Sequence, residues 1–264
     1  MNILNKLTIS RRLTQSDLSV FILILFTFSS CSYLPAEYTD FGIPGYQETT
    51  EYIKLTSSEP GTNSTLIFLP GGLVDPHAYI SLMNKVAQEG TSVIILKLSA
   101  NLAILEMSKP LRVMDDFPDV QNWYISGHSL GGISAQSLVN KKPDLFNGLI
   151  LLGVYPSERY SISDWDKNVL SIYAENDQLS TIEEIEANEN YLPVGIKINE
   201  PAEIDSLDIS NPATLYYLIN GGNHSQFGNY GFQKGDGVSA ISTEEQHEKT
   251  STLIIKYINW NESL

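Results

Sequence analysis

Six short runs of apolar and β-branched residues recur along the chain, and longer amphipathic stretches separate them. The runs lie at residues 65–69, 93–96, 123–125, 149–152, 169–173 and 214–219. The stretches between and after them predict helices at residues 76–89, 102–107, 130–140, 181–190 and 243–260. Continuous apolar strands that alternate with helices indicate a parallel sheet covered on both faces. We therefore predict an α/β fold with an open, mostly parallel, doubly wound sheet, whose functional sites lie at the carboxyl ends of the strands.

The composition fits one large domain and restricts its partners. The chain has 264 residues, of which 42% are hydrophobic, and this is enough apolar material for a sizeable core. Its formal net charge is -15. Nucleic-acid binding needs a basic face that displaces counterions from phosphates, so we expect no nucleic-acid partner. The same charge disfavours attachment to anionic lipid by charge alone.

The first 30 residues predict an export signal. Basic residues at the start precede an apolar core at residues 20–28, which is too short to span a bilayer as a mature helix. The segment ends in Phe28-Ser29-Ser30-Cys31, which resembles a bacterial lipobox. The resemblance implies that Cys31 is lipidated and becomes the new N-terminus.

Cys31 is also the single cysteine of the chain, so no intramolecular disulfide is possible. We predict an exported lipoprotein that is anchored through Cys31 on the periplasmic or cell-surface side of a membrane. If Cys31 is incidental to an ordinary cleavage site, the protein is secreted instead. Residues 31–51 show no clear periodicity and are interpreted as a tether and lead-in, and residues 52–264 as the globular domain.

The sequence Gly127-His128-Ser129-Leu130-Gly131 lies between the predicted strand 123–125 and the predicted helix 130–140. This is the G-x-S-x-G pattern of a nucleophile elbow in its expected context. A turn this sharp strains the serine backbone, and the flanking glycines remove side chains that would collide with the neighbouring strand and helix. The following helix places a positive partial charge beside a developing oxyanion. We therefore predict that Ser129 is a catalytic nucleophile.

An oxyanion hole needs a second backbone N–H besides that of Leu130, and in this type of site it comes from the loop after an earlier strand. The sequence Pro70-Gly71-Gly72-Leu73 follows the predicted strand 65–69 directly. Gly72 is the first candidate for the donor and Leu73 the second. Pro-Gly-Gly is also common in ordinary turns, so the prediction depends on its position after a strand.

A serine nucleophile needs a base, and in this fold the nucleophile, acid and histidine follow one another in that order along the chain. The chain has four histidines. His77 precedes Ser129, His128 belongs to the elbow itself, and His247 falls within the last predicted helix. His224, in the loop after the last predicted strand, alone fits the position of the base.

The acid must lie beyond a strand end between Ser129 and His224. Asp177 follows the predicted strand 169–173 and is the first candidate, with Glu175 as its rival in the same loop. Asp164 and Asp166 lie one connection earlier, where turn or helix-capping roles suit them better. Residues 230–237 form a glycine-rich segment after the histidine, which we interpret as a turn.

Four segments that carry these residues resemble the α/β-hydrolase superfamily, and within it the small-cap branch related to dienelactone hydrolases and bacterial carboxylesterases. They are residues 69–76, 126–132, 171–177 and 221–228, within a resemblance that spans residues 52–257. The chain has serine where dienelactone hydrolases have cysteine, so their substrate is not carried over. The sequence has no Walker loop, H-E-x-x-H helix or cysteine cluster, and we expect no metal or organic cofactor.

The combined hypothesis is a serine hydrolase of the carboxylesterase type with a Ser129–His224–Asp177 triad and a small-molecule ester substrate. The connection between predicted strands 149–152 and 169–173 is short, which indicates little or no cap and favours short or medium acyl groups. A thioesterase or peptidase would use the same residues. A surface lipoprotein that only binds its ligand through this fold is the alternative from another class.

Overall fold

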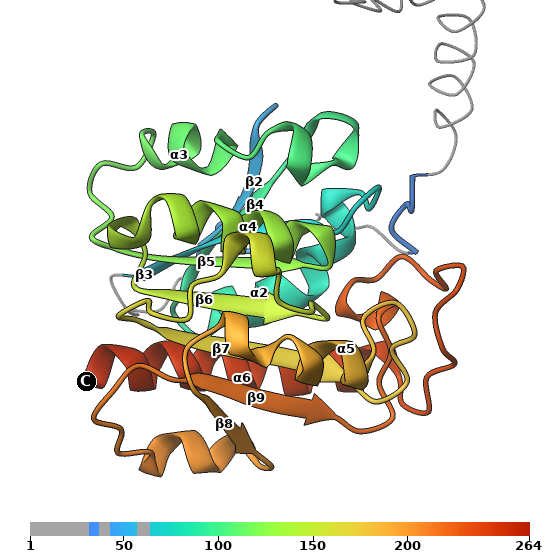
Figure 1. Cartoon of the computed structure of the whole chain (residues 1–264). Helices are drawn as coiled ribbons and strands as arrows, with labels where there is room; N and C mark the ends of the chain where they lie inside the picture. The colour runs from blue at the N-terminus through green and yellow to red at the C-terminus, as the bar shows by residue number, and fades with distance from the viewer. Residues whose placement is uncertain (1–31, 37–42, 57–63) are drawn as a thin grey trace, which may run out of the picture. The chain divides into compact units, whose positions relative to one another are not determined.

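The computed structural model describes residues 32–36, 43–56 and 64–264. The predicted export signal and Cys31 lie outside the described residues. Tyr33–Leu264 forms one compact unit, and its described part contains the nine-stranded sheet of Figure 1. In chain order the strands are β1 (Gln47–Glu48), β2 (Tyr52–Leu55), β3 (Ser64–Leu69), β4 (Ser92–Leu96), β5 (Asn122–His128), β6 (Gly148–Leu152), β7 (Asn168–Ala174), β8 (Gly195–Ile198) and β9 (Thr214–Ile219).

The spatial order of the strands is β1-β2-β4-β3-β5-β6-β7-β9-β8. All neighbouring pairs from β4 to β8 in this order are parallel, whereas β1 and β2 add an antiparallel edge. The chain therefore forms the mostly parallel, doubly wound sheet that the sequence predicted. Parallel neighbours require crossover connections, which place helices on the faces of the sheet.

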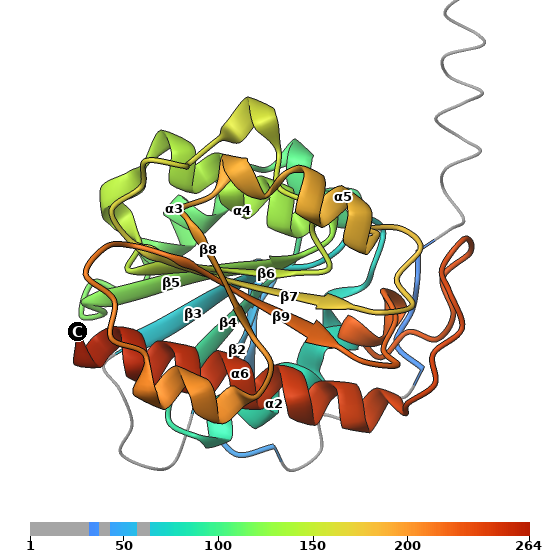
Figure 2. The same ribbon diagram turned by 60° about the horizontal axis from the view of Figure 1, so that its bottom comes forward.

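Five α-helices in the described part cover the two faces: α2 (Ile80–Gln88), α3 (Lys109–Met114), α4 (Leu130–Lys141), α5 (Ile182–Ala187) and α6 (Thr243–Ser263). Figure 2 shows α2 and α6 on one face and α3, α4 and α5 on the other. Each face of the sheet has its own hydrophobic core, and strand β3 contributes to both. Leu66 and Phe68 pack on the side of α2 and α6, while Ile67 and Leu69 pack on the side of α4. Burial of both faces explains why the strand is apolar throughout. None of these helices is both long and apolar enough to cross a bilayer.

Two features of the secondary structure differ from the sequence-based prediction. The predicted helix 102–107 is wrong: residues 103–105 form only the short 3-10 turn η3, and the helix α3 begins at Lys109. Pro110 explains this shift, since proline is tolerated in the first turn of a helix but not in its interior. The sequence also missed β1, β2 and β8, which lie toward the two edges of the sheet and alternate or are partly exposed rather than continuously buried.

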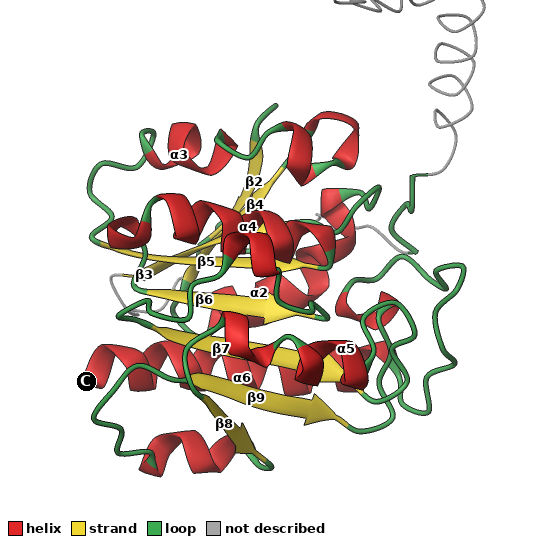
Figure 3. Cartoon of the chain, viewed as in Figure 1, coloured by secondary structure: helices red, strands yellow, loops and turns green. Residues whose placement is uncertain are grey.

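The carboxyl ends of the parallel strands all lie at the same end of the sheet, and the loops that follow the strands meet there (Figure 3). The loops after β3, β5, β7 and β9 carry all the predicted catalytic and oxyanion-hole residues. The connection between β6 and β7 contains only one short 3-10 turn, η5 (Glu158–Tyr160), and therefore adds no helical cap over this end of the sheet.

Candidate active site

Ser129 lies in the turn between the last residue of β5 and the first residue of α4. Its backbone has φ 52° and ψ -124°, a conformation that residues with a side chain rarely adopt. Such strain costs on the order of 1–3 kcal/mol and persists only where the surrounding structure holds it. Here the Ser129 N–H donates to the Leu152 carbonyl at 3.0 Å, and the Ser129 carbonyl accepts from the Gly132 N–H at 2.9 Å. The predicted elbow is therefore present.

Two glycines of the motif are required by close backbone contact. A Cβ at Gly127 would lie 2.3 Å from the carbonyl carbon of Gly131, and a Cβ at Gly131 would lie 2.1 Å from the carbonyl oxygen of Leu69. Both distances are far below a van der Waals contact, and the opposing atoms belong to the backbone. The G-x-S-x-G spacing is thus the condition under which α4 can begin directly against β3 and β5.

The Ser129 side chain is half-buried and lines a cavity of about 160 Å³. The other residues that line this cavity are mostly apolar: Leu130, Ile133, Val154, Tyr155, Leu179 and Ser180. The first two belong to α4, and the others come from the connections after β6 and β7. A small pocket thus opens beside the strained serine.

The structure brings His224 and Asp177 together, although they lie in loops after different strands. His224 Nδ1 lies 2.7 Å from Asp177 Oδ2, and both side chains are buried. Asp177 is acceptor-only when ionised, so the Nδ1 proton of His224 is donated to it and Nε2 is left as an acceptor. His224 Nε2 is buried and has no hydrogen-bond partner among the described residues. The Nδ1 side of the imidazole is therefore held by a carboxylate as in a triad, whereas the described residues include no hydrogen bond between Nε2 and the Ser129 hydroxyl group.

The His224–Asp177 pair lies beside the elbow. A Cβ at Gly153 would come within 3.1 Å of His224 Nδ1 and 3.2 Å of Asp177 Oδ2. Gly153 directly follows Leu152, which accepts the hydrogen bond from the Ser129 N–H. The ring of His128, the residue before Ser129, lies 4.4 Å from the ring of His224 between centroids. These contacts place the base and its carboxylate partner next to the predicted nucleophile.

The rival carboxylates have other roles in the structure. Glu175 is exposed, and its Oε2 accepts a hydrogen bond from the Gly221 N–H at 2.7 Å. Asp177, in contrast, also accepts with Oδ1 from the N–H groups of Leu179 and Ser180, at 2.8 and 2.7 Å. These bonds fix the carboxylate that faces His224.

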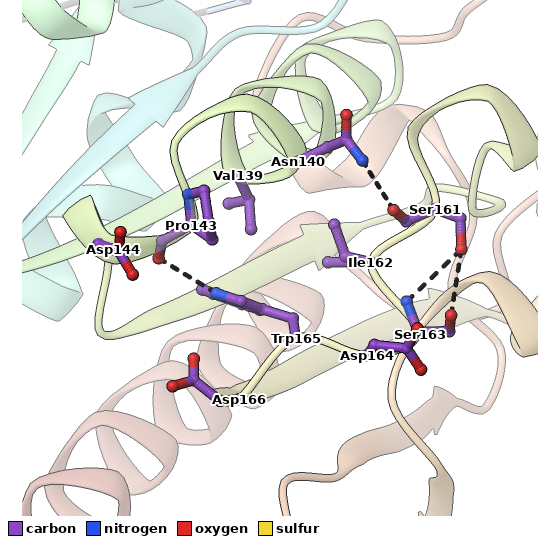
Figure 4. Close-up of a pocket in the computed structure, with 10 residues that line it drawn as sticks. All are labelled: Val139, Asn140, Pro143, Asp144, Ser161, Ile162, Ser163, Asp164, Trp165 and Asp166. Atoms are coloured by element: carbon purple, nitrogen blue, oxygen red, sulfur yellow. Dashed lines mark hydrogen bonds between the residues drawn. The ribbon is translucent and has the colours of Figure 1, made fainter.

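Asp164 and Asp166 line a separate pocket of about 460 Å³, built from the end of α4 and the connection before β7 (Figure 4). Both side chains are exposed, and the pocket lies at the end of α4 opposite to Ser129. Neither residue takes part in the site around the elbow.

Two of the oxyanion candidates, Gly72 and Leu130, are neighbours in the structure. A Cβ at Gly72 would be 3.2 Å from Cδ2 and 3.5 Å from Cβ of the Leu130 side chain. Leu73 has a positive φ of 62°, and its N–H already donates to the Asn101 carbonyl at 2.8 Å. This hydrogen bond leaves Gly72 as the better second donor beside Leu130, since the N–H of Leu73 is engaged.

The start of the compact unit contacts this same loop. The Tyr33 N–H donates to the Leu73 carbonyl at 2.8 Å, and the Asp75 N–H donates to the Tyr33 carbonyl at 2.9 Å. The Tyr33 ring packs at 5.4 Å from that of Tyr230. The lead-in thus stabilises the loop at residues 70–75, which we call the oxyanion loop because it carries the candidate donor Gly72. The lack of periodicity in the lead-in did not reveal this role.

Asp236 is a further buried acid that the sequence interpretation assigned only to a turn. Its carboxylate accepts from the N–H groups of His224 and Ser225 at 3.2 and 2.8 Å, and from the Ser225 hydroxyl at 2.7 Å. It therefore fixes the backbone of the loop that carries the predicted base.

Among the residues that the structure describes, no group of three or more His, Cys, Asp or Glu side chains is arranged to hold a metal ion.

A family model described as the alpha/beta hydrolase family matches residues 65–248 of this chain. This range includes Ser129, Asp177 and His224 and covers more than half of the sequence. No curated protein matches the chain.

Solved structures with the same fold include several esterases. Est1E from Butyrivibrio proteoclasticus is 12% identical, with a TM-score of 0.56 over 81% of this chain and 94% of that chain. A thermophilic esterase from Thermogutta terrifontis is 12% identical, with a TM-score of 0.54 over 82% and 98%. A dienelactone hydrolase from Anabaena variabilis is 13% identical, with a TM-score of 0.54 over 80% and 98%. At these identities the likeness shows a shared fold and nothing further.

Proposed function

The chain belongs to the alpha/beta hydrolase family, and on that basis we propose that it is a serine hydrolase that cleaves carboxylic esters of short or medium acyl chains. The observation that carries the proposal is the buried 2.7 Å contact between His224 Nδ1 and Asp177 Oδ2 beside the strained Ser129. This contact leaves His224 Nε2 as a buried acceptor without a protein partner in the described part of the chain. A nitrogen held in this way has the orientation of a general base.

The proposed reaction proceeds through an acyl-enzyme. His224 Nε2 takes the proton of the Ser129 hydroxyl as Oγ attacks the ester carbonyl, and Asp177 stabilises the imidazolium that forms. The N–H groups of Gly72 and Leu130 hold the oxyanion, aided by the N-terminus of α4. His224 then gives its proton to the leaving alkoxide. In the second half, His224 takes a proton from water, the resulting nucleophile attacks the acyl carbonyl, and the acid leaves as Ser129 regains its proton.

The size of the cavity sets the expected acyl preference. Its volume of about 160 Å³ is below the roughly 300–1,000 Å³ that is common for ligand sites. We expect kcat/KM for p-nitrophenyl esters to be highest for short or medium acyl chains and to fall as longer chains outgrow the pocket. The measurement is a series from acetate to palmitate under conditions where every substrate is soluble. A maximum at the longest chains would contradict the size argument.

The type of scissile bond is tested with one acyl group on three leaving groups. The ester proposal expects the oxygen ester to react with a higher kcat/KM than the corresponding thioester or anilide. Preference for the thioester or anilide would instead favour the thioesterase or the peptidase. A folded wild-type chain that turns over none of the three would favour the binding-protein alternative.

We also propose that the protein is exported and anchored to a membrane through a lipid on Cys31. The support is the sequence: an export signal that ends in a lipobox-like tetrapeptide with the single cysteine of the chain.

The lipid anchor is tested by metabolic labelling of the full chain in a bacterial host with a palmitate analogue. We expect label on the wild type and none on Cys31→Ala, together with release of the variant from the membrane fraction. Label that persists in Cys31→Ala would contradict acylation at this residue.

A further inference from the structure

Beneath the elbow, two buried aromatic side chains connect the oxyanion loop to the base. Tyr79 ends the 3-10 turn η1 (Pro76–Tyr79), and its hydroxyl oxygen accepts the Gly71 N–H at 3.0 Å. The same hydroxyl group lies 2.8 Å from His128 Nδ1. Both Tyr79 and His128 have no exposed surface. The triad mechanism uses neither of them, so their polar contacts need another explanation.

The direction of these hydrogen bonds follows from the available protons. The Tyr79 oxygen accepts from the Gly71 N–H, so its own proton is free to be donated to His128 Nδ1. Burial raises the pKa of Tyr79 well above its usual value, which keeps that proton in place. Burial, and next the neighbouring His224, hold the pKa of His128 well below its usual range. His128 is thus a neutral imidazole, and in the tautomer that carries its proton on Nε2, Nδ1 accepts from the Tyr79 hydroxyl group.

The two ends of this arrangement lie at the reaction centre. Gly71 directly precedes Gly72, whose N–H is the proposed oxyanion donor. A hydrogen bond to the Gly71 N–H fixes the Pro70–Gly71 peptide plane, which is adjacent to the plane that carries the Gly72 N–H. At the other end, the His128 ring packs at 4.4 Å from the ring of His224. His128 also precedes Ser129 in the chain. One buried hydroxyl group therefore connects the oxyanion loop with the residue that contacts both nucleophile and base.

Gly71 is matched to this pair. A Cβ at Gly71 would lie 2.8 Å from His128 Nδ1 and 2.9 Å from the Tyr79 oxygen. Both neighbours are fully buried ring systems. The absence of a side chain at Gly71 is thus the condition under which the hydroxyl group can reach the N–H.

We infer that Tyr79 and His128 are positioning residues for the hydrolysis reaction: they hold the Gly71–Gly72 loop in the geometry that stabilises the oxyanion, and they do not touch the reacting atoms. This inference rests on the proposed function. It predicts that loss of the Tyr79 hydroxyl group weakens transition-state binding while substrate binding is kept.

The test measures kcat, KM and the affinity for an alkyl boronic acid in the full chain and its Tyr79→Phe variant. A boronate adduct on the serine places an oxygen in the oxyanion hole, so its affinity reports the geometry of the hole. We expect kcat and boronate affinity to fall together by about ten- to a hundredfold, less than the roughly 10²–10³-fold that follows removal of a donor itself. KM should stay within about twofold, because ground-state binding is unchanged.

A second pair of variants separates the hydrogen bond from packing. His128→Phe keeps a ring but removes the acceptor, and should lose boronate affinity as Tyr79→Phe does. His128→Asn keeps an acceptor near the position of Nδ1, and should recover most of that affinity.

Tyr124→Phe is the matched control for a lost buried hydroxyl group. Tyr124 is also buried, and its hydroxyl oxygen accepts from Asn261 Nδ2 at 2.9 Å. It lies near the amino end of β5, whereas the elbow follows the carboxyl end of this strand. We expect wild-type kcat and boronate affinity for this variant. A thermal melt of each variant is the control that checks whether it is folded.

The outcomes are distinct. A folded Tyr79→Phe with wild-type kcat and boronate affinity would overturn the positioning role, as would an equal loss in Tyr124→Phe. A wild-type chain that neither hydrolyses esters nor forms a boronate adduct would overturn the proposed function, and the positioning role with it.

Discussion

Replacing Ser129 by alanine is expected to lower kcat by about six orders of magnitude, which is the effect of losing the nucleophile of a serine triad. In the proposed reaction the Ser129 hydroxyl oxygen is the attacking atom, and Ser129 is the residue of its cavity that lies in the strained elbow. KM should change little, because the cavity walls remain. The residual rate should still exceed that of the uncatalysed reaction, since the N–H groups of Gly72 and Leu130 are intact.

Ser163→Ala is the matched control for this substitution. Ser163 is exposed and lines the separate pocket of Figure 4, so its hydroxyl group has no path to the elbow. The variant should hydrolyse esters at the wild-type rate. Equal hydrolysis by Ser129→Ala and the wild type would remove Ser129 from the mechanism.

Replacing Asp177 by asparagine is expected to lower kcat by about four orders of magnitude while the fold is retained. The Asn amide can still accept from the N–H groups of Leu179 and Ser180 with its oxygen. Its NH₂ group would then face His224 Nδ1, where only an acceptor fits the required tautomer. The imidazole would accept at Nδ1 and carry its proton at Nε2, so it could not take the serine proton.

The control for Asp177→Asn is its neighbour in the same loop. Glu175→Gln replaces an exposed carboxylate that accepts from the Gly221 N–H, and it should keep activity close to that of the wild type. The reversed result, with an active Asp177→Asn and an inactive Glu175→Gln, would reassign the acid to Glu175. The measurement is kcat for the best ester of the chain-length series.

The sequence was sufficient for the parts of the site that depend on local patterns and chain order. The elbow could be predicted because glycine spacing, strand and helix coincide around Ser129. His224 and Asp177 followed from their order after the strands, and the structure brings them into contact. The predicted helix 243–260 begins at the same residue as α6, and Ser242 caps this start by accepting from the Glu245 N–H at 3.1 Å.

Other features depend on contacts between distant segments, and no local pattern reveals them. Tyr79 and His128 are 49 residues apart, and they meet only when η1 packs beneath the elbow. Asp236 lies in a glycine-rich turn, where a local interpretation favours solvent exposure, yet the fold of the loop buries its carboxylate against the His224 backbone. Strand β8 is short and partly exposed at the sheet edge, so its sequence lacks the continuous apolar run that indicated its neighbours.

The central claim is that Ser129 is activated by His224, and a fluorophosphonate probe tests it most directly because it reacts covalently with activated serines. The full chain is labelled with the probe, and the modified peptide is identified by mass spectrometry in the wild type, Ser129→Ala and His224→Ala. We expect one adduct, on Ser129, in the wild type and none in either variant. A folded wild type without an adduct, or an adduct on Ser129 that forms equally fast in His224→Ala, would contradict the claim.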